Sequence, residues 1–122
     1  MIGIDLVKIS RMNRFIERFG EKALLRFLSK EEVALVKNHK TASGFWAAKE
    51  ACSKALGVGI GFECSFHDIT IYKTQNGAPK LKLPEKLLKK FNISDISLSI
   101  THDGEYAIAV VAIESTSADK IQ

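Results

Sequence analysis

Cysteine, proline and long apolar runs are all scarce in this sequence. Its 122 residues include two prolines and two cysteines, Cys52 and Cys64, which form neither a CxxC metal pattern nor a dense disulfide framework. Such sparing use of cysteine is typical of a reducing compartment, so we expect both to be buried thiols. No apolar run approaches the ~18 residues that span a bilayer. We therefore expect a soluble protein without a membrane partner.

Targeting signals and several catalytic motifs are also missing. The N-terminal sequence MIGIDLVKIS has no basic region before its apolar stretch and no small-residue cleavage site, which argues against a signal peptide and for a cytoplasmic location. Neither a GxSxG nor a Walker A motif is present. His39 and His67 are isolated from other metal-ligating residues, so a zinc site is not expected.

Length and charge limit what the chain does. We expect one domain over residues 1–115 and a disordered tail over 116–122. Eighteen Lys and Arg against fourteen Asp and Glu give a net charge of +4, which suits an acidic protein partner or a phosphate-bearing ligand. The basic residues are spread along the chain without interleaved aromatics, so nucleic acid is not the partner that we expect.

The first half of the chain has the pattern of helices after one strand. An apolar stretch interrupted by one acid predicts a buried strand, and Ser10 is the candidate cap of the helix that follows it and stops at Gly20. Ser29 and Glu32 match a capping box. In order, we expect a strand over 2–7, helices over 11–19, 21–27, 30–38 and 41–56, and a glycine loop over 57–61.

The second half alternates as strands do. The turn Gln75-Asn76-Gly77 predicts a β-hairpin, and the full set is strands over 66–73, 80–83, 96–100 and 106–113 with a short helix over 84–91. Helices precede antiparallel strands without βαβ alternation. The fold class is therefore α+β, with helices of the N-terminal half packed on a small, mainly antiparallel sheet.

The predicted helix over 41–56 has two distinct stripes. Its core stripe consists of Phe45, Ala48, Cys52, Ala55 and Leu56, and its polar stripe of Trp46, Glu50, Lys54 and Gly57. One interpretation makes Glu50 and Lys54 a solvated pair that contributes ~0.3–0.5 kcal/mol. The other makes the stripe a ligand site, because the glycine loop leaves backbone N–H groups open to an anion whose charge Lys54 or a metal would balance.

Asp5 is the anomaly of the N-terminal strand. A carboxylate among apolar residues either accepts a hydrogen bond from a buried donor or binds a metal. Together, Asp5 and Glu50 offer enough oxygen ligands for Mg²⁺, which takes its other ligands from water and phosphates. His102 follows an apolar strand, where it is either an ordinary turn residue or a side chain presented to a cleft.

Several segments together resemble one family. They are Gly3-Ile4-Asp5 followed by Arg11, the stretch from Trp46 to Gly61, the turn Asn76-Gly77-Ala78-Pro79, and Ser99-Ile100-Thr101-His102 leading into residues 106–111. In this order, the sequence resembles the small bacterial holo-[acyl-carrier-protein] synthases, a branch of the 4'-phosphopantetheinyl transferases. The resemblance implies their fold and the Mg²⁺-dependent transfer of 4'-phosphopantetheine from coenzyme A to a serine of apo acyl carrier protein. It also implies release of adenosine 3',5'-bisphosphate and a role in fatty acid biosynthesis and lipid metabolism.

The resemblance also implies roles for individual residues. Asp5 and Glu50 would hold Mg²⁺ and, with Lys54, form the catalytic group. Coenzyme A would contact Trp46, Ser53, Lys54, Gly57, Pro79, Thr101 and His102. The carrier protein would dock on Arg11, Arg14 and Arg18. The family is typically a homotrimer with active sites between subunits.

One position departs from the family pattern. Many relatives have an arginine where this chain has Phe45, next to the aromatic residue of the "FAAKE" stretch. One contact to the nucleotide phosphates is therefore missing, and Lys40, Lys49 or Lys73 are the candidate substitutes.

Two other functions remain open from the sequence. A metal-independent acyltransferase that uses coenzyme A would depend on His102 and not on Asp5. A non-catalytic basic adaptor would bind acidic proteins through Arg11, Arg14 and Arg18 and would tolerate loss of both acids.

Overall fold

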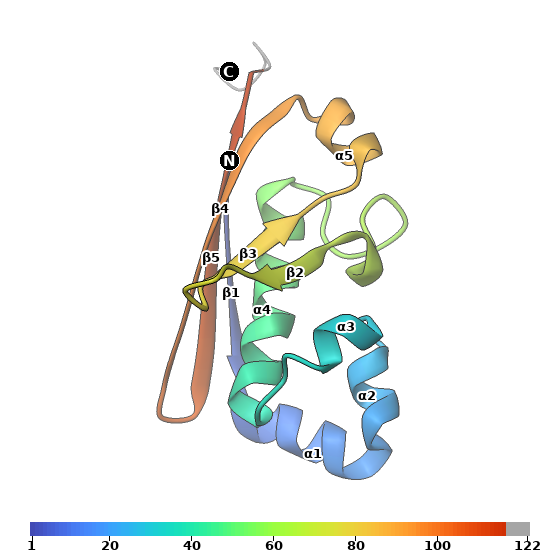
Figure 1. The fold of residues 1–122 in the computed structure, drawn as a ribbon, viewed down its shortest axis with the longest axis vertical. Coiled ribbons are helices and arrows are strands. Elements are labelled where there is room, and N and C mark those ends of the chain that lie inside the picture. The colour runs from blue at the N-terminus through green and yellow to red at the C-terminus, as the bar shows by residue number, and fades with distance from the viewer. Residues whose placement is uncertain (117–122) are drawn as a thin grey trace.

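Helix α4 (His39–Ala55) lies against one face of a three-stranded antiparallel sheet in the computed structural model, which describes residues 1–116 (Figure 1). The order of strands in this sheet is β1 (Ile2–Lys8), β5 (Tyr106–Ser115) and β4 (Ile93–Asp103). The strands nearest in sequence to the two chain ends, β1 and β5, are therefore neighbours, and α4 packs on both.

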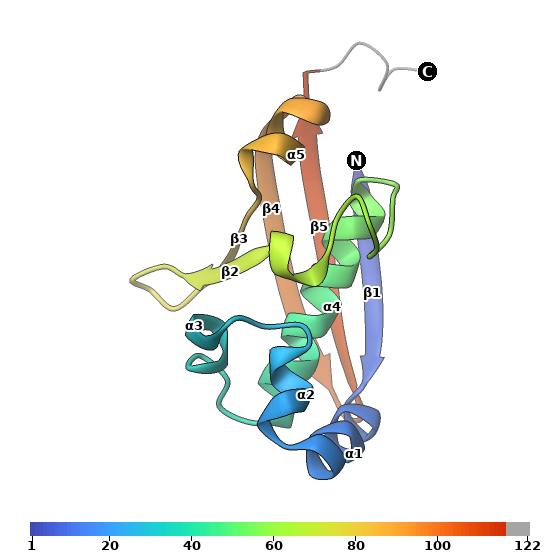
Figure 2. The ribbon, with the colours of Figure 1, turned by 90° about the vertical axis from the view of Figure 1, so that its right-hand side faces the viewer.

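The remaining elements surround this central unit. They are α1 (Ile9–Phe19), α2 (Glu21–Leu25), α3 (Lys30–Val33), the 3-10 helix η1 (Phe66–Asp68), β2 (Thr70–Lys73), β3 (Pro79–Lys82) and α5 (Glu85–Lys90). Figure 2 shows α1, α2 and α3 at one end of the sheet and α5 at the other. Strands β2 and β3 form a separate two-stranded sheet. The predicted α+β class is confirmed.

The predicted helices are present, but several of their ends differ from the prediction. Ser29 makes the expected capping box with Glu32, although α3 ends at Val33. Asn38 caps α4, its side chain accepting a hydrogen bond from the Thr41 N–H at 3.0 Å. The prediction that Ser10 caps the first helix is wrong, because α1 continues directly from β1 and Ser10 lies inside it.

The predicted hairpin is present, but its first strand is shorter than expected. Ser65 and Asp68 form a reciprocal capping box that turns residues 66–68 into η1 and delays β2 to Thr70. At the hairpin turn, Gly77 adopts a φ of 83°, a left-handed conformation that glycine accommodates without strain.

The prediction of a fully buried N-terminal strand is wrong. The outward side chains Ile2, Ile4 and Leu6 are 74%, 58% and 57% exposed. They lie beside Ala112, Val110 and Ile108 of β5, respectively. We call Ile2, Ile4, Leu6, Ile108 and Val110 the outer sheet face; α4 covers the opposite side.

The core stripe predicted for α4 is confirmed. Its members are Phe45, Ala48, Cys52, Ala55 and Leu56, and all are buried. Both cysteines are buried, unpaired thiols, as expected. Burial raises the pKa of Cys52 to about 12 and that of Cys64 to about 11, which makes both thiols unreactive.

A buried ion pair joins α4 to the rest of the molecule. The Lys49 ammonium, fully buried, lies 2.8 Å from a carboxylate oxygen of Glu32 and donates to the carbonyls of Phe27 and Phe66 at 2.8 and 3.1 Å. Glu32 also accepts the backbone N–H groups of Ser29 and Ile71, each at 2.7 Å. Lys49 is thus not available to a phosphate, which removes it from the candidate substitutes for the missing arginine.

The end of β5 is held by a contact with the residue before β4. Ser115 is buried at the end of β5, and the Thr116 N–H donates to the Asn92 carbonyl at 2.9 Å. Of the tail expected over 116–122, residues 117–122 lie outside the part of the chain that the structure describes. Within the described part, no helix has the length and apolar character needed to cross a bilayer.

Replacing Lys49 tests the buried ion pair. Lys49→Met is expected to lower the free energy of unfolding by about 3–5 kcal/mol, because it leaves the Glu32 carboxylate buried without its charged partner. Urea denaturation measures this loss. The control is Lys86→Met, which removes an exposed ion pair with Asp68 and should cost less than about 1 kcal/mol. Equal losses in the two variants would contradict the structural role of Lys49.

Candidate active site

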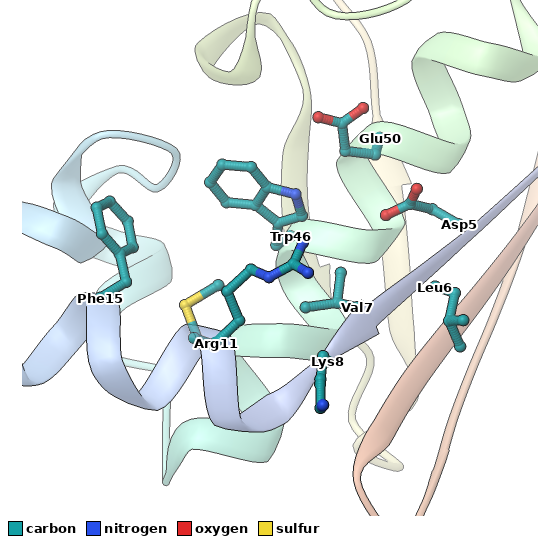
Figure 3. A pocket seen from close by; sticks show the side chains of 9 residues that line it. Asp5, Leu6, Val7, Lys8, Arg11, Phe15, Trp46 and Glu50 are labelled. Atoms are coloured by element: carbon teal, nitrogen blue, oxygen red, sulfur yellow. The ribbon is translucent and has the colours of Figure 1, made fainter.

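Two acids from different elements meet at one cavity. Asp5 comes from β1 and Glu50 from α4, and the cavity between them has a volume of about 480 Å³. Figure 3 shows both carboxylates on the same side of α4, with Trp46 and Arg11 close to them. The lining residues are Asp5, Leu6, Val7, Lys8, Arg11, Met12, Phe15, Trp46 and Glu50. The cavity is thus mainly apolar, with charge at its edge.

Lys54 is paired with Asp5 and not with Glu50. Its ammonium lies 2.9 Å from an Asp5 carboxylate oxygen and 3.3 Å from the Ile4 carbonyl. The hydrogen bond to Asp5 raises the pKa of Lys54. The interpretation of Glu50 and Lys54 as a solvated pair on one helix is therefore wrong. Lys54 instead joins α4 to β1 and remains half exposed, within reach of a ligand.

The ionised form of Glu50 is disfavoured by its surroundings. Its half-buried position raises the pKa of its carboxyl, the negative charge of Asp5 raises it further, and Lys54 partly opposes both effects. Two carboxylates that repel each other at a cavity form a good cation site. Their oxygens are the donors that Mg²⁺ prefers. Within residues 1–116, no group of three or more His, Cys, Asp or Glu is placed to hold a metal ion by itself.

The indole of Trp46 forms a fixed wall of the cavity. Its ring centroid lies 4.9 Å from that of Phe27, 4.7 Å from that of Phe66 and 6.5 Å from that of Phe15. These tilted and edge contacts hold the ring between α1, α4 and η1. A ligand at Glu50 therefore meets a rigid apolar surface one helical turn away.

The arginines of α1 lie on the surface of the molecule. Arg11, Arg14 and Arg18 are all exposed, and Arg11 also lines the cavity. The Arg18 guanidinium lies over the Phe19 ring, 5.2 Å from its centroid. The helix therefore offers positive charge at the cavity entrance and along the neighbouring surface.

Ser53 and Gly57 shape the end of α4. The Ser53 hydroxyl is buried and donates to the Glu50 carbonyl at 2.7 Å, so it faces the helix backbone. The Ser53 carbonyl accepts the N–H groups of Val58 and Gly59, both at 3.2 Å. With Gly57 at a φ of 79°, these bonds fold the glycine loop back over the last turn of α4.

A second, smaller cavity gathers another group of predicted site residues. It has a volume of about 140 Å³ and is lined by Lys40, Thr41, Gly44, Phe45, Lys73, Pro79, Ile100 and His102. Thr101, the neighbour of His102 on β4, is exposed. Two of the three lysines proposed as substitutes for the missing arginine, Lys40 and Lys73, thus lie beside Phe45. The two cavities of one chain share no lining residue.

Sequence reasoning missed part of the first cavity. It gave no site role to Lys8, Met12 or Phe15, yet all three line the cavity. A signal was present in the connection, because a helix that begins directly after β1 must pass close to Asp5.

Comparison with known proteins identifies the family of the chain. A model of the 4'-phosphopantetheinyl transferase superfamily matches residues 1–111, so the chain belongs to that superfamily. The holo-[acyl-carrier-protein] synthase of Sulfurimonas denitrificans is 74% identical over 99% of this chain and 100% of the relative. The holo-[acyl-carrier-protein] synthase of Campylobacter fetus is 59% identical over 94% of this chain and 100% of the relative. Within the superfamily, the chain is a member of the holo-[acyl-carrier-protein] synthases.

Solved structures agree with this assignment. The Helicobacter pylori holo-[acyl-carrier-protein] synthase, determined in complex with coenzyme A, has a TM-score of 0.90 and 49% identity over 93% of this chain and 100% of its own. The Neisseria meningitidis enzyme has a TM-score of 0.85 and 32% identity over 93% of this chain and 97% of its own. The predicted family and its fold are confirmed.

Glu50→Gln tests the repulsion between the two acids. A group whose pKa is raised by folding favours the folded state at low pH, and this contribution is lost as the pH rises through the raised value. We therefore expect Glu50→Gln to leave the melting temperature unchanged near pH 4 and to raise it at pH 8. Differential scanning calorimetry without metal ions measures both. Glu85→Gln on the surface of α5 is the control; a Glu50→Gln chain less stable than wild type at pH 8 would contradict the repulsion.

Proposed function

We propose that this chain transfers the 4'-phosphopantetheine group of coenzyme A to a serine of apo acyl carrier protein. The observation that carries the proposal is the convergence of Asp5 from β1 and Glu50 from α4 at one cavity, with Lys54 paired to Asp5, in a chain of the holo-[acyl-carrier-protein] synthase family. Two acids and one base beside a glycine loop suit a diphosphate and its cation.

The residues have complementary roles in the transfer. The carrier serine oxygen attacks the β-phosphorus of coenzyme A, the bond from this phosphorus to the bridging oxygen breaks, and adenosine 3',5'-bisphosphate leaves with that oxygen. Mg²⁺ bound by Asp5 and Glu50 would neutralise charge on the diphosphate. Lys54 exchanges its bond to Asp5 for one to a phosphate oxygen, and Trp46 limits how the substrate lies. The serine proton passes to Glu50, to a water or to another carboxylate.

The second cavity suits the nucleotide end of coenzyme A. Lys40, Lys73 and His102 offer positive charge or hydrogen bonds to the 3'-phosphate, and Pro79 offers an apolar surface to the adenosine. Lys40 and Lys73 thereby supply the charge that the family arginine would provide at the position of Phe45. Thr101 extends this surface along β4.

The outer sheet face supports assembly of the chain as a homotrimer. Ile2, Ile4 and Leu6 form an exposed apolar strip beside Val110, which is a typical feature of a protein interface. In such an assembly, one subunit supplies the nucleotide-binding cavity and its neighbour supplies Asp5, Glu50 and Lys54. A chain that sediments as a monomer at assay concentrations would contradict this arrangement.

The carrier protein is proposed to dock on α1. Arg11, Arg14 and Arg18 give this helix a basic surface next to the cavity, which suits an acidic partner. The acceptor serine then approaches from the Arg11 side. In the cell, we place this reaction in the cytoplasm and in fatty acid biosynthesis.

The direct test follows the mass of an apo acyl carrier protein mixed with the chain, coenzyme A and Mg²⁺. We expect the carrier to gain one phosphopantetheine, and we expect Asp5→Asn, Glu50→Gln or a chelator to slow the gain by at least ~100-fold, because each removes charge stabilisation at the diphosphate. Arg18→Ala, outside the cavity, should weaken carrier binding while leaving coenzyme A binding unchanged. Transfer that survives chelation and loss of Asp5 would favour an acyltransferase. Carrier binding without transfer would favour the adaptor.

Coenzyme A without its 3'-phosphate tests the second cavity. Lys40→Met and Lys73→Met are each expected to raise the KM for coenzyme A by ~10-fold or more, the size of one lost charged hydrogen bond. The KM for 3'-dephospho-coenzyme A should not change. Steady-state kinetics measures the KM for both substrates. Lys80→Met on the same hairpin is the matched control. Equal effects on both substrates would place the 3'-phosphate elsewhere.

A further inference from the structure

We propose that Gly3 is a positioning residue for the transfer, because the absence of a side chain there sets the separation between Asp5 of β1 and two residues of α4, Glu50 and Lys54. Gly3 and Asp5 face α4 from the same side of β1, since side chains alternate along a strand. This inference rests on the proposed function. According to the proposal, Gly3, which has no functional group of its own, sets the spacing of the side chains that hold the diphosphate and its cation.

The backbone of β1 touches the backbone of α4 at Gly3. A Cβ atom at Gly3 would lie 1.9 Å from the Ala51 carbonyl oxygen and 2.6 Å from the Ala55 nitrogen. Both are main-chain atoms, so no side-chain rotation relieves the overlap. Ordinary contact at about 3.5 Å requires β1 and α4 to separate by more than about 1 Å.

The two contacted positions place this constraint next to the site. Ala51 directly follows Glu50, and Ala55 directly follows Lys54. Gly3 therefore lies against the two helical turns that carry the cation ligand and the phosphate ligand. Two residues later on the same strand, Asp5 reaches Lys54 at 2.9 Å and lines the same cavity as Glu50. Close approach at Gly3 is what brings the Asp5 carboxylate within reach of both.

The contact at Gly3 differs from those at most other glycines of the chain. A Cβ at Gly20, Gly57, Gly59, Gly61, Gly77 or Gly104 would meet no atom within 4 Å. Gly44 would meet the Ile100 side chain at 2.9 Å, and no main-chain atom of another element lies within 4 Å of that Cβ position. Gly3 also has no left-handed φ, so turn geometry does not explain the residue. Close packing of β1 on α4 does.

The test compares wild type with Gly3→Ala, Asp5→Glu and the double variant. Calorimetry measures the affinity for coenzyme A with and without Mg²⁺, and steady-state kinetics measures kcat and KM. Gly3→Ala should abolish most of the Mg²⁺-dependent gain in affinity and lower kcat by ~100-fold, the effect of a displacement of about 1 Å. Asp5→Glu lengthens the acid by about 1.5 Å. It should impair the wild-type chain but restore Mg²⁺-dependent affinity to Gly3→Ala by ~10-fold or more.

The rescue separates positioning from general loss of stability. Leu87→Ala, a core substitution on α5, is the control for destabilisation and should keep the wild-type Mg²⁺ dependence. Wild-type binding by Gly3→Ala, or independent losses that simply add in the double variant, would overturn the proposal. A wild-type chain that neither binds coenzyme A nor transfers its arm would instead overturn the proposed function, and this inference with it.

Folding of the variant is checked by circular dichroism before binding is measured. If Gly3→Ala is unfolded in buffer, all variants are compared in concentrated sucrose, which favours the compact state. A Gly3→Ala chain that stays unfolded there would also overturn the proposal, because Gly3 would then be a requirement of folding and not of spacing.

Discussion

The buried ammonium of Lys49 is the constraint on which the orientation of α4 depends. A charge without solvent needs a full set of partners, and these come from Glu32, Phe27 and Phe66 on three other segments. Once Lys49 points inward, the next residue, Glu50, must lie on the flank of the helix toward β1. The functional side of α4 is therefore determined by a residue that takes no part in ligand contact. The same ion pair holds β2 through the Ile71 N–H, which connects the helix of the acids to the hairpin of the second cavity.

Features with a local cause were predictable from the sequence. The core and polar stripes of α4 follow from helical periodicity, the turn at Gly77 from its composition, and the capping box at Ser29 from two residues three apart. Contacts between distant segments were not predictable from the sequence. The pattern shows neither that Lys49 would find Glu32, 17 residues away, nor that Lys54 would select Asp5, 49 residues away, over its helical neighbour Glu50.

The error at β1 has a different physical origin. Hydrophobic composition reports that a surface avoids water and does not report which molecule covers it. Residues 2–7 therefore have the composition of a strand buried on both faces, although α4 covers only one. At the site, residue chemistry paired Asp5 with Glu50 as possible oxygen ligands, and the family resemblance added Lys54 to them before any geometry linked β1 to α4.

The exposed apolar strip of β1 also has a thermodynamic consequence. Any association that removes Ile2, Ile4 and Leu6 from water makes folding and assembly a single equilibrium governed by mass action. The melting temperature would then rise with protein concentration. Dilution, and not temperature alone, becomes a denaturing condition for such a molecule.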